Sequence, residues 1–202
     1  MTRLLVGLGA LLWLAGCTSL PPSNPDNLCE IFREKDDWYD DAKKAEKRWG
    51  SPIPTMMAIV HQESRFHAKA KPPRKYFLWF IPMGRLSDAY GYAQAKDGTW
   101  QWYIDKSGNR GADRDDFADA IDFVGWYNNQ SAHQCRIDPA DTYHLYLAYH
   151  EGHGGFNRRT FRDKAWLKAV AHKVSARSQR YGRQLESCRE ELESRGWFFG
   201  WF

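Results

Sequence analysis

The sequence lacks the features that would place it at once in several large classes of protein. Its longest apolar run, residues 4–14, is much shorter than the roughly 20 residues that a bilayer span needs. Outside residues 71–90 no segment alternates apolar and polar residues as half-buried strands do, and no internal repeat is visible. Neither sign of charge dominates, since 29 basic and 25 acidic residues leave a net charge of +4. These absences argue against a membrane-spanning, repeat or all-β protein, and we expect no nucleic-acid partner.

The amino-terminal residues predict export. Arg3 precedes the apolar run, and the segment ends in small residues before Cys17, so residues 1–16 are interpreted as a signal peptide. The Leu-Ala-Gly-Cys ending resembles the bacterial lipobox, which implies cleavage before Cys17 and lipidation of that residue. Thr18 is not the aspartate that retains lipoproteins in the inner membrane, so the expected location is the outer membrane, facing the periplasm. The alternative is an ordinary secretory signal with an incidental cysteine.

The mature chain of about 185 residues is long enough for one domain with a substantial core. Residues 17–27 contain three prolines and predict a lipidated tether, followed by a catalytic domain over residues 28–195. Residues 196–202 form an aromatic tail, which we expect either to contact the membrane or to fold back over an apolar surface such as residues 77–81. The protein is expected to be a monomer.

Three cysteines remain if Cys17 carries lipid, in what would be an oxidising compartment. Cys29 opens the first predicted helix and Cys188 lies near the end of the last one. A disulfide between them would connect the two ends of the domain and contribute about 4–5 kcal/mol in the chain-entropy model. Cys135 would then be a free thiol, unless it takes one of those partners, and the spacing alone leaves this open.

Helical patterns account for most of the mature chain. Asn27 and Glu30 form a capping-box-like start, and an apolar stripe then predicts one helix up to Trp49, ended by Gly50. Further helices are predicted over residues 52–66, from about 98 to 103, 115–127 and 139–149. A last, long helix is predicted to begin near Asp163, with Cys188 near its end. The predicted fold class is therefore mostly α.

Glu63 occupies an unusual position in the second of these helices. Met56, Ile59 and Val60 form one apolar face, and Glu63 follows at the next step of the same periodicity. Burial of a carboxylate disfavours its charged form and raises its pKa toward the range of a general acid at neutral pH. The alternative is a glutamate at the end of an amphipathic stripe, in solvent or paired with Arg65 or Arg74.

Three short motifs carry a family resemblance. They are, in chain order, Glu63-Ser64-Arg65-Phe66 with Ala70, Gly91-Tyr92-Ala93-Gln94, and Ala148-Tyr149-His150-Glu151-Gly152. The set resembles the signature of the lytic transglycosylases of the soluble type, lysozyme-like enzymes that cleave peptidoglycan. The resemblance implies a lysozyme-like single domain that acts on peptidoglycan glycan strands without a cofactor or metal.

The resemblance also implies roles for individual residues. Glu63 would first protonate the glycosidic oxygen and then act as base on the C6 hydroxyl of the substrate, which leaves a 1,6-anhydro-muramoyl end. Tyr149 would hydrogen-bond and orient Glu63, while Ser64 and Gln94 contact the sugar. The Gly91 backbone would approach the saccharide closely.

Two departures from the family pattern affect the expected cleft. Residues 71–90 are inserted between the first and second motifs, and we interpret them as a loop or hairpin beside the cleft. His150-Glu151 replaces the usual Asn-Ala of the third motif. About two of five aromatic residues are expected to stack on sugars, the others being core; the five are Trp79, Tyr92, Trp100, Trp102 and Trp126.

Three other functions compete with this interpretation. A goose-type lysozyme would hydrolyse the bond with a second carboxylate, for which Asp88 is the first candidate and Asp97 and Glu151 are weaker ones. A zinc enzyme could use His150 and His153, although their spacing is not that of a His-Glu-x-x-His motif. A non-catalytic wall-binding lipoprotein would keep the cleft and could tolerate loss of Glu63.

Overall fold

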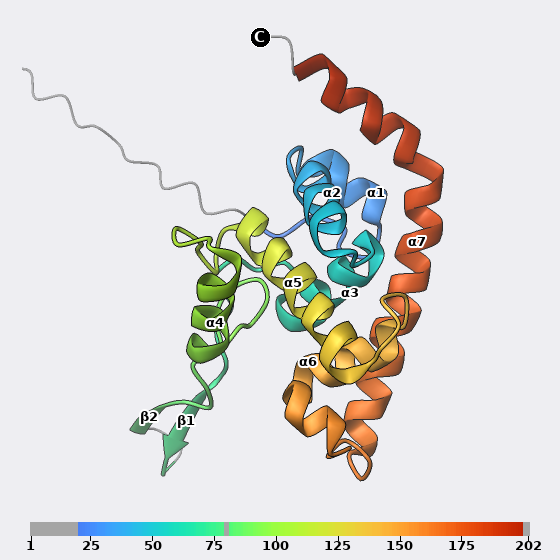
Figure 1. Ribbon diagram of the computed structural model, residues 1–202. Coiled ribbons are helices and arrows are strands. Elements are labelled where there is room, and N and C mark those ends of the chain that lie inside the picture. Colours follow the sequence, from blue (N-terminus) through green and yellow to red (C-terminus); the bar gives the residue numbers. More distant parts are fainter. Residues whose placement is uncertain (1–19, 79–80, 200–202) are drawn as a thin grey trace, which may run out of the picture.

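The computed structural model describes residues 20–78 and 81–199, which form seven helices and one two-stranded sheet (Figure 1). The signal peptide, Cys17, Trp79 and the last three aromatic-tail residues lie outside the described residues. The elements are α1 (Leu28–Glu34), α2 (Trp38–Trp49), α3 (Ile53–Ser64), β1 (Arg74–Phe77), β2 (Ile81–Arg85), α4 (Asp97–Ser107), α5 (Phe117–Cys135), α6 (Thr142–Asn157) and α7 (Ala165–Phe199). The predicted mostly α-helical single domain is confirmed.

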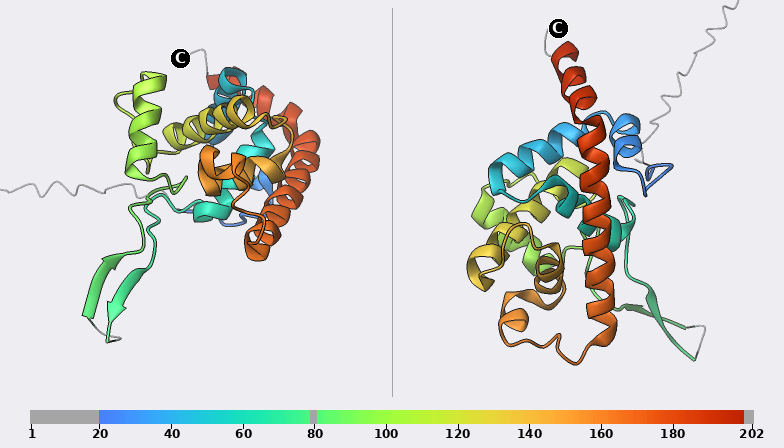
Figure 2. Two further views of the ribbon diagram at one scale, coloured as in Figure 1. Left: turned by 60° about the horizontal axis from the view of Figure 1, so that its bottom comes forward. Right: turned by 90° about the vertical axis from the view of Figure 1, so that its right-hand side faces the viewer.

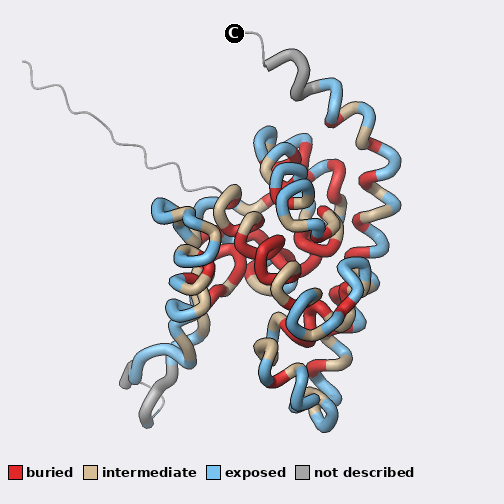
Figure 3. Tube along the Cα trace, viewed as in Figure 1, coloured by how far each residue is buried: buried red, intermediate tan, exposed pale blue. Residues whose placement is uncertain are grey.

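Helix α3 lies at the centre of the domain. Pro52 and Pro54 set its first turn, and its residues from Met56 to Val60 are fully buried. Helices α2, α5 and α7 pack around it, and the buried part of the trace is concentrated where α3 and α5 meet (Figure 3). Any side chain that α3 carries is therefore held in a well-packed environment.

The first predicted helix is divided in two. Asn27 caps α1 as expected, because its side chain accepts hydrogen bonds from the Cys29 and Glu30 amides. The helix then ends at Lys35, and α2 begins at Trp38. The break turns the indole of Trp38 onto the ring of Phe117, with 3.7 Å between the ring centroids. Tertiary aromatic packing thus overrides a continuous helical pattern.

The last helix, α7, is long as predicted, with 35 residues, or about 52 Å. It runs along α1, α3 and α6, and the Cys29–Cys188 disulfide joins it to α1 as the sequence predicts, while Cys135 is free. Residues 196–199 continue the helix instead of starting a separate tail. Its end and the β-hairpin lie at opposite ends of the molecule (Figure 1), so the predicted fold-back onto residues 77–81 is wrong.

The described part of the predicted tether is attached to the domain. Asp26 forms ion pairs with Arg177 and Arg180, and the Tyr181 hydroxyl donates to the carbonyl of Pro25. Gln184 donates to the Asp26 carbonyl (3.2 Å). The chain is therefore fixed to α7 at Pro25 and Asp26, immediately before α1 begins at Leu28.

The insertion contains a hairpin. Strands β1 and β2 pair antiparallel, with Arg74 opposite Arg85, and project from the helical body (Figure 2). Leu78, Met83 and Leu86 are exposed. In the described part of the chain, no helix has the length and apolar character needed to cross a membrane.

Candidate active site

Glu63 lies in the last turn of α3, where the chain changes direction sharply. The two residues that end the helix, Arg65 and Phe66, both have left-handed backbone conformations, with φ of 50° and 62°. The Phe66 ring is fully buried and packs against Trp38 and His61. Because Phe66 anchors the turn, the position of Glu63 at the end of the helix is fixed.

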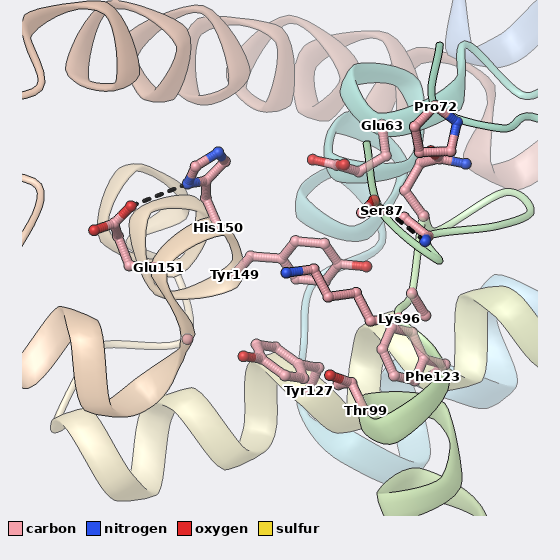
Figure 4. Close-up of a pocket in the computed structure, with 14 residues that line it drawn as sticks. Glu63, Pro72, Ser87, Lys96, Thr99, Phe123, Tyr127, Tyr149, His150 and Glu151 are labelled. Atoms are coloured by element: carbon pink, nitrogen blue, oxygen red, sulfur yellow. Dashed lines mark hydrogen bonds and ion pairs between the residues drawn. The ribbon is translucent and has the colours of Figure 1, made fainter. Parts of the chain in front are cut away.

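Glu63 borders a pocket of about 430 Å³ between α3, the loop before α4, α5 and α6. Figure 4 shows its carboxylate facing the same space as Tyr149 and Lys96. The lining residues are Glu63, Pro72, Ser87, Ala89, Gln94, Ala95, Lys96, Thr99, Phe123, Tyr127, Tyr149, His150, Glu151 and Gly152. Since Pro72, Ser87 and Ala89 belong to the insertion, its base forms part of the pocket wall.

The environment of Glu63 favours the protonated carboxyl group. Burial raises the pKa of Glu63 to about 7, although a hydrogen bond from Tyr146 acts in the opposite direction. The negative end of the α3 dipole also lies near this last turn and disfavours a carboxylate. Near neutral pH Glu63 can therefore hold a proton and can also release it.

The two tyrosines near Glu63 have different partners from those expected. The Tyr149 hydroxyl donates its one proton to the carbonyl of Ala93 (2.6 Å), so it cannot also donate to Glu63. The side chain that hydrogen-bonds Glu63 is Tyr146. Tyr149 nevertheless lines the same pocket as Glu63. Burial, and then the nearby charge of Glu63, raise the pKa of Tyr149 well above its ordinary value. The spacing of three residues on one helix was the available signal for Tyr146.

The second motif shapes the loop that carries Gln94. Gln94 borders the pocket, and its side-chain amide donates to the carbonyls of Ala70 and Gly91 (2.9 Å each). Gly91 has a φ of +80°, and a Cβ there would lie 2.0 Å from the backbone oxygen of Arg114. The Arg114 backbone, and not a saccharide, is therefore what lies close to Gly91. Gly91 does not line the pocket.

The other predicted sugar contacts are placed differently. The hydroxyl of Ser64 donates back to the Val60 carbonyl (3.2 Å), and Ser64 borders a second groove instead of the first pocket. Tyr92 is 1 % exposed and packs against Trp38 and Phe117, which makes it part of the core. Trp100 and Trp126 are likewise buried, and Trp102 packs on Trp126.

Glu151 is a second carboxylate on the pocket wall, but it is engaged in an ion pair. Both of its oxygens lie 2.8 Å from the Lys164 ammonium, and His150 and Thr160 also hydrogen-bond to it. Although burial alone would raise the pKa of Glu151, these partners lower it to about 2. Helix α6 kinks directly afterwards at Gly152, whose φ of 72° and ψ of 158° suit only glycine.

A second groove of about 750 Å³ also borders Glu63 and adjoins the first pocket. It shares Glu63, Pro72 and Gln94 with the first pocket. Its lining also includes Arg65, Lys69 and Lys71, and it reaches Leu20 and Pro21 of the amino-terminal segment. The carboxyl group thus lies between two adjoining depressions, an arrangement suited to an elongated substrate.

Comparison with protein families agrees with the motifs and with this arrangement. A family model described as a transglycosylase SLT domain matches residues 5–188. The chain belongs to this family. The protein is therefore a peptidoglycan lytic transglycosylase, a lyase that acts on glycan strands. No curated protein matches the chain.

The carboxylates that would support hydrolysis by the transglycosylase are poorly placed. Asp88 is exposed, borders a different depression and accepts a hydrogen bond from the Asp97 amide (3.3 Å). Asp97 pairs with Arg114 (2.7 Å). Neither Asp88 nor Asp97 lines the pocket of Glu63.

The histidines of the third motif of the transglycosylase have separate environments. His150 hydrogen-bonds to Glu151, whereas His153 hydrogen-bonds to Ser131 (2.9 Å) and stacks on Tyr127. Within residues 20–78 and 81–199, no group of three histidine, cysteine or acidic side chains is arranged to hold a metal ion.

Proposed function

We propose that the enzyme cleaves the β-1,4 bond between N-acetylmuramic acid and N-acetylglucosamine without water and leaves 1,6-anhydro ends. The observation that carries this proposal is the contrast between the two glutamates of the pocket. Glu63 has a pKa of about 7, whereas Glu151 is ion-paired to Lys164 with a pKa of about 2. One carboxyl group is thus available for proton transfer, and the other is occupied. A mechanism with a single acid–base residue fits this pair better than one with two.

In the first step, protonated Glu63 donates its proton to the glycosidic oxygen, and the bond from C1 to that oxygen breaks. The leaving strand departs with a free hydroxyl group, and C1 gains oxocarbenium character. In the second step, the Glu63 carboxylate accepts the proton of the C6 hydroxyl of the same sugar while that oxygen forms a bond to C1. Glu63 is protonated again at the end, so no water and no external proton is consumed.

The neighbours of Glu63 support both steps. The hydrogen bond from Tyr146 stabilises the carboxylate that exists between them. Tyr149 is held by Ala93, and we assign it to shaping the wall next to the reacting sugar. Gln94 and Ser64, which border the pocket and the adjoining groove, are assigned to substrate binding.

The test uses purified Glu63→Gln and peptidoglycan. The amide is nearly isosteric but cannot donate a carboxyl proton, so turnover should fall by about 10²–10⁴ with glycan binding retained. Mass spectrometry of the products from the parent enzyme should show 1,6-anhydro ends. Reducing ends would instead establish a hydrolase, and a fully active Glu63→Gln would reject the role of Glu63.

We further propose that the enzyme is a lipoprotein of the outer membrane, anchored through Cys17 and facing the periplasm. The lipobox-like sequence before Cys17 and the substrate of the family support this location. The Cys29–Cys188 disulfide is also compatible with an oxidising compartment. A mature chain that begins elsewhere or carries no acyl group would contradict the proposal.

A further inference from the structure

Trp166 is the exposed tryptophan of the helical body. Of the tryptophans whose exposure the structure describes, the others are buried or partly buried, whereas 57 % of Trp166 is accessible. A single exposed apolar side chain is normal on a protein surface, so its exposure alone indicates nothing. The position of Trp166 relative to the pocket is what distinguishes it.

Trp166 contacts His150, a residue of the pocket wall. It is the second residue of α7, and its ring centroid is 5.2 Å from that of His150, with the rings almost perpendicular at 77°. His150 lines the pocket that contains Glu63, and Figure 4 shows it on the α6 side of that space, across from Glu63. The indole therefore lies directly beside the pocket wall, in contact with His150.

The two segments that carry these rings are joined to each other. His150 is fixed through Nδ1 to the Glu151 carboxylate (3.1 Å), which is itself clamped by Lys164. The backbone carbonyl of Lys164 accepts a hydrogen bond from the amide of Leu167 (3.0 Å). Leu167, which follows Trp166 in the sequence, is fully buried. Because the ion pair connects α6 to the start of α7, the His150 ring and the backbone that carries Trp166 are positioned before any ligand arrives.

We propose that Trp166 and His150 form a further saccharide subsite, at the part of the pocket wall that His150 provides. The proposal rests on the proposed function, since it assumes that a glycan strand occupies the pocket. The ring of an N-acetylated pyranose has an apolar C–H face, which packs on the indole, and polar edges, which need hydrogen-bond partners. His150 has Nδ1 engaged with Glu151, so Nε2 is the atom that meets a sugar hydroxyl or acetamido group.

The combination favours a sugar over a purely apolar ligand. His150 contacts the indole and is paired with Glu151, which is paired with Lys164. An apolar ligand packed at this place would desolvate these polar groups without compensation. A glycan strand that leaves the pocket past His150 meets the indole without bending away from the protein. Strands long enough to reach Trp166 should therefore bind more tightly than shorter ones.

The experiment measures glycan binding in the inactive Glu63→Gln protein, so that the ligand is not consumed. Calorimetric titration would use peptidoglycan glycan strands of several disaccharide units and, separately, a single disaccharide. Trp166→Ala should raise the Kd for the longer strands roughly tenfold and leave the Kd for the disaccharide unchanged. Trp166→Phe, which keeps an aromatic face, should lose much less affinity. The matched control is Met83→Ala, since Met83 is similarly exposed but lies on the hairpin.

A second readout separates binding from a structural role. Tryptophan fluorescence of the Glu63→Gln protein should change on adding the longer strands, and Trp166→Phe should remove that change without lowering the melting temperature. Equal affinity of Trp166→Ala and its parent for both ligands would overturn the subsite while leaving the proposed function intact. Failure of the Glu63→Gln parent to bind any glycan would overturn the proposed function and the subsite together.

Discussion

At the scale of single residues, the proposed two-step mechanism depends on how Tyr146 and burial act on Glu63. Burial favours the neutral carboxyl group that the first step needs, and the hydrogen bond from Tyr146 favours the carboxylate that the second step needs. A pKa of about 7 keeps both forms accessible near neutral pH. The motif in the sequence identified Glu63, but the partner of a side chain depends on tertiary packing. This is why the hydrogen bond expected from Tyr149 is made by Tyr146.

This balance predicts a shift in the pH profile. Because free Glu63 must be protonated to act as an acid, kcat/KM should fall as the pH rises through about 7. Tyr146→Phe removes a hydrogen bond that stabilises the carboxylate, so the pKa of Glu63 should rise further and the falling limb should move to higher pH. Rates on glycan strands between pH 5 and 9 test this. Tyr103→Phe is the control, since Tyr103 is a buried tyrosine bonded to Asp122 instead. An unmoved limb in Tyr146→Phe would contradict the assignment.

At the scale of elements, the sequence predicts the helix ends that depend on local capping, but it does not predict those that depend on long-range packing. Asn27 and Gly50 cap α1 and α2 as predicted, because capping depends on a few neighbouring atoms. The break before Trp38 depends on Phe117, which is far away in the sequence. The length of α7 follows from a local signal in its sequence. Its buried residues repeat at alternating intervals of four and three, namely Leu167, Ala171, Val174, Ser178, Tyr181, Leu185, Cys188 and Leu192.

The disulfide between α1 and α7 should contribute measurably to stability. It closes a loop across 159 positions, for which the chain-entropy model gives about 4–5 kcal/mol. The Cys29→Ser, Cys188→Ser double variant should therefore have a clearly lower melting temperature, with activity below that temperature preserved because Glu63 lies elsewhere. Cys135→Ser is the control, since Cys135 is a free thiol. Equal melting temperatures for the double variant and the parent would show that the bridge is not formed in solution.

At the scale of the whole molecule, the proposed lipid anchor at Cys17 can be tested by substitution. Cys17→Ala removes the sulfur that would receive the lipid, so the variant should be soluble or remain unprocessed. Fractionation of cells and mass spectrometry of the amino terminus measure this. The control is Thr18→Ala, which keeps the cysteine. A processed Cys17→Ala protein that stays in the membrane would contradict the lipoprotein assignment.

The attachment of Pro25 and Asp26 to α7 limits the distance from the membrane at which the proposed lipoprotein can act. Leu20 borders the groove beside Glu63, and Cys17 precedes it by only three residues, which span at most roughly 10 Å. A lipid on Cys17 would therefore hold the domain a short distance from the membrane, with the cleft close to the bilayer surface. Such an enzyme would trim the layer of wall nearest the membrane, and the local spacing between membrane and wall would decide which strands it can cut.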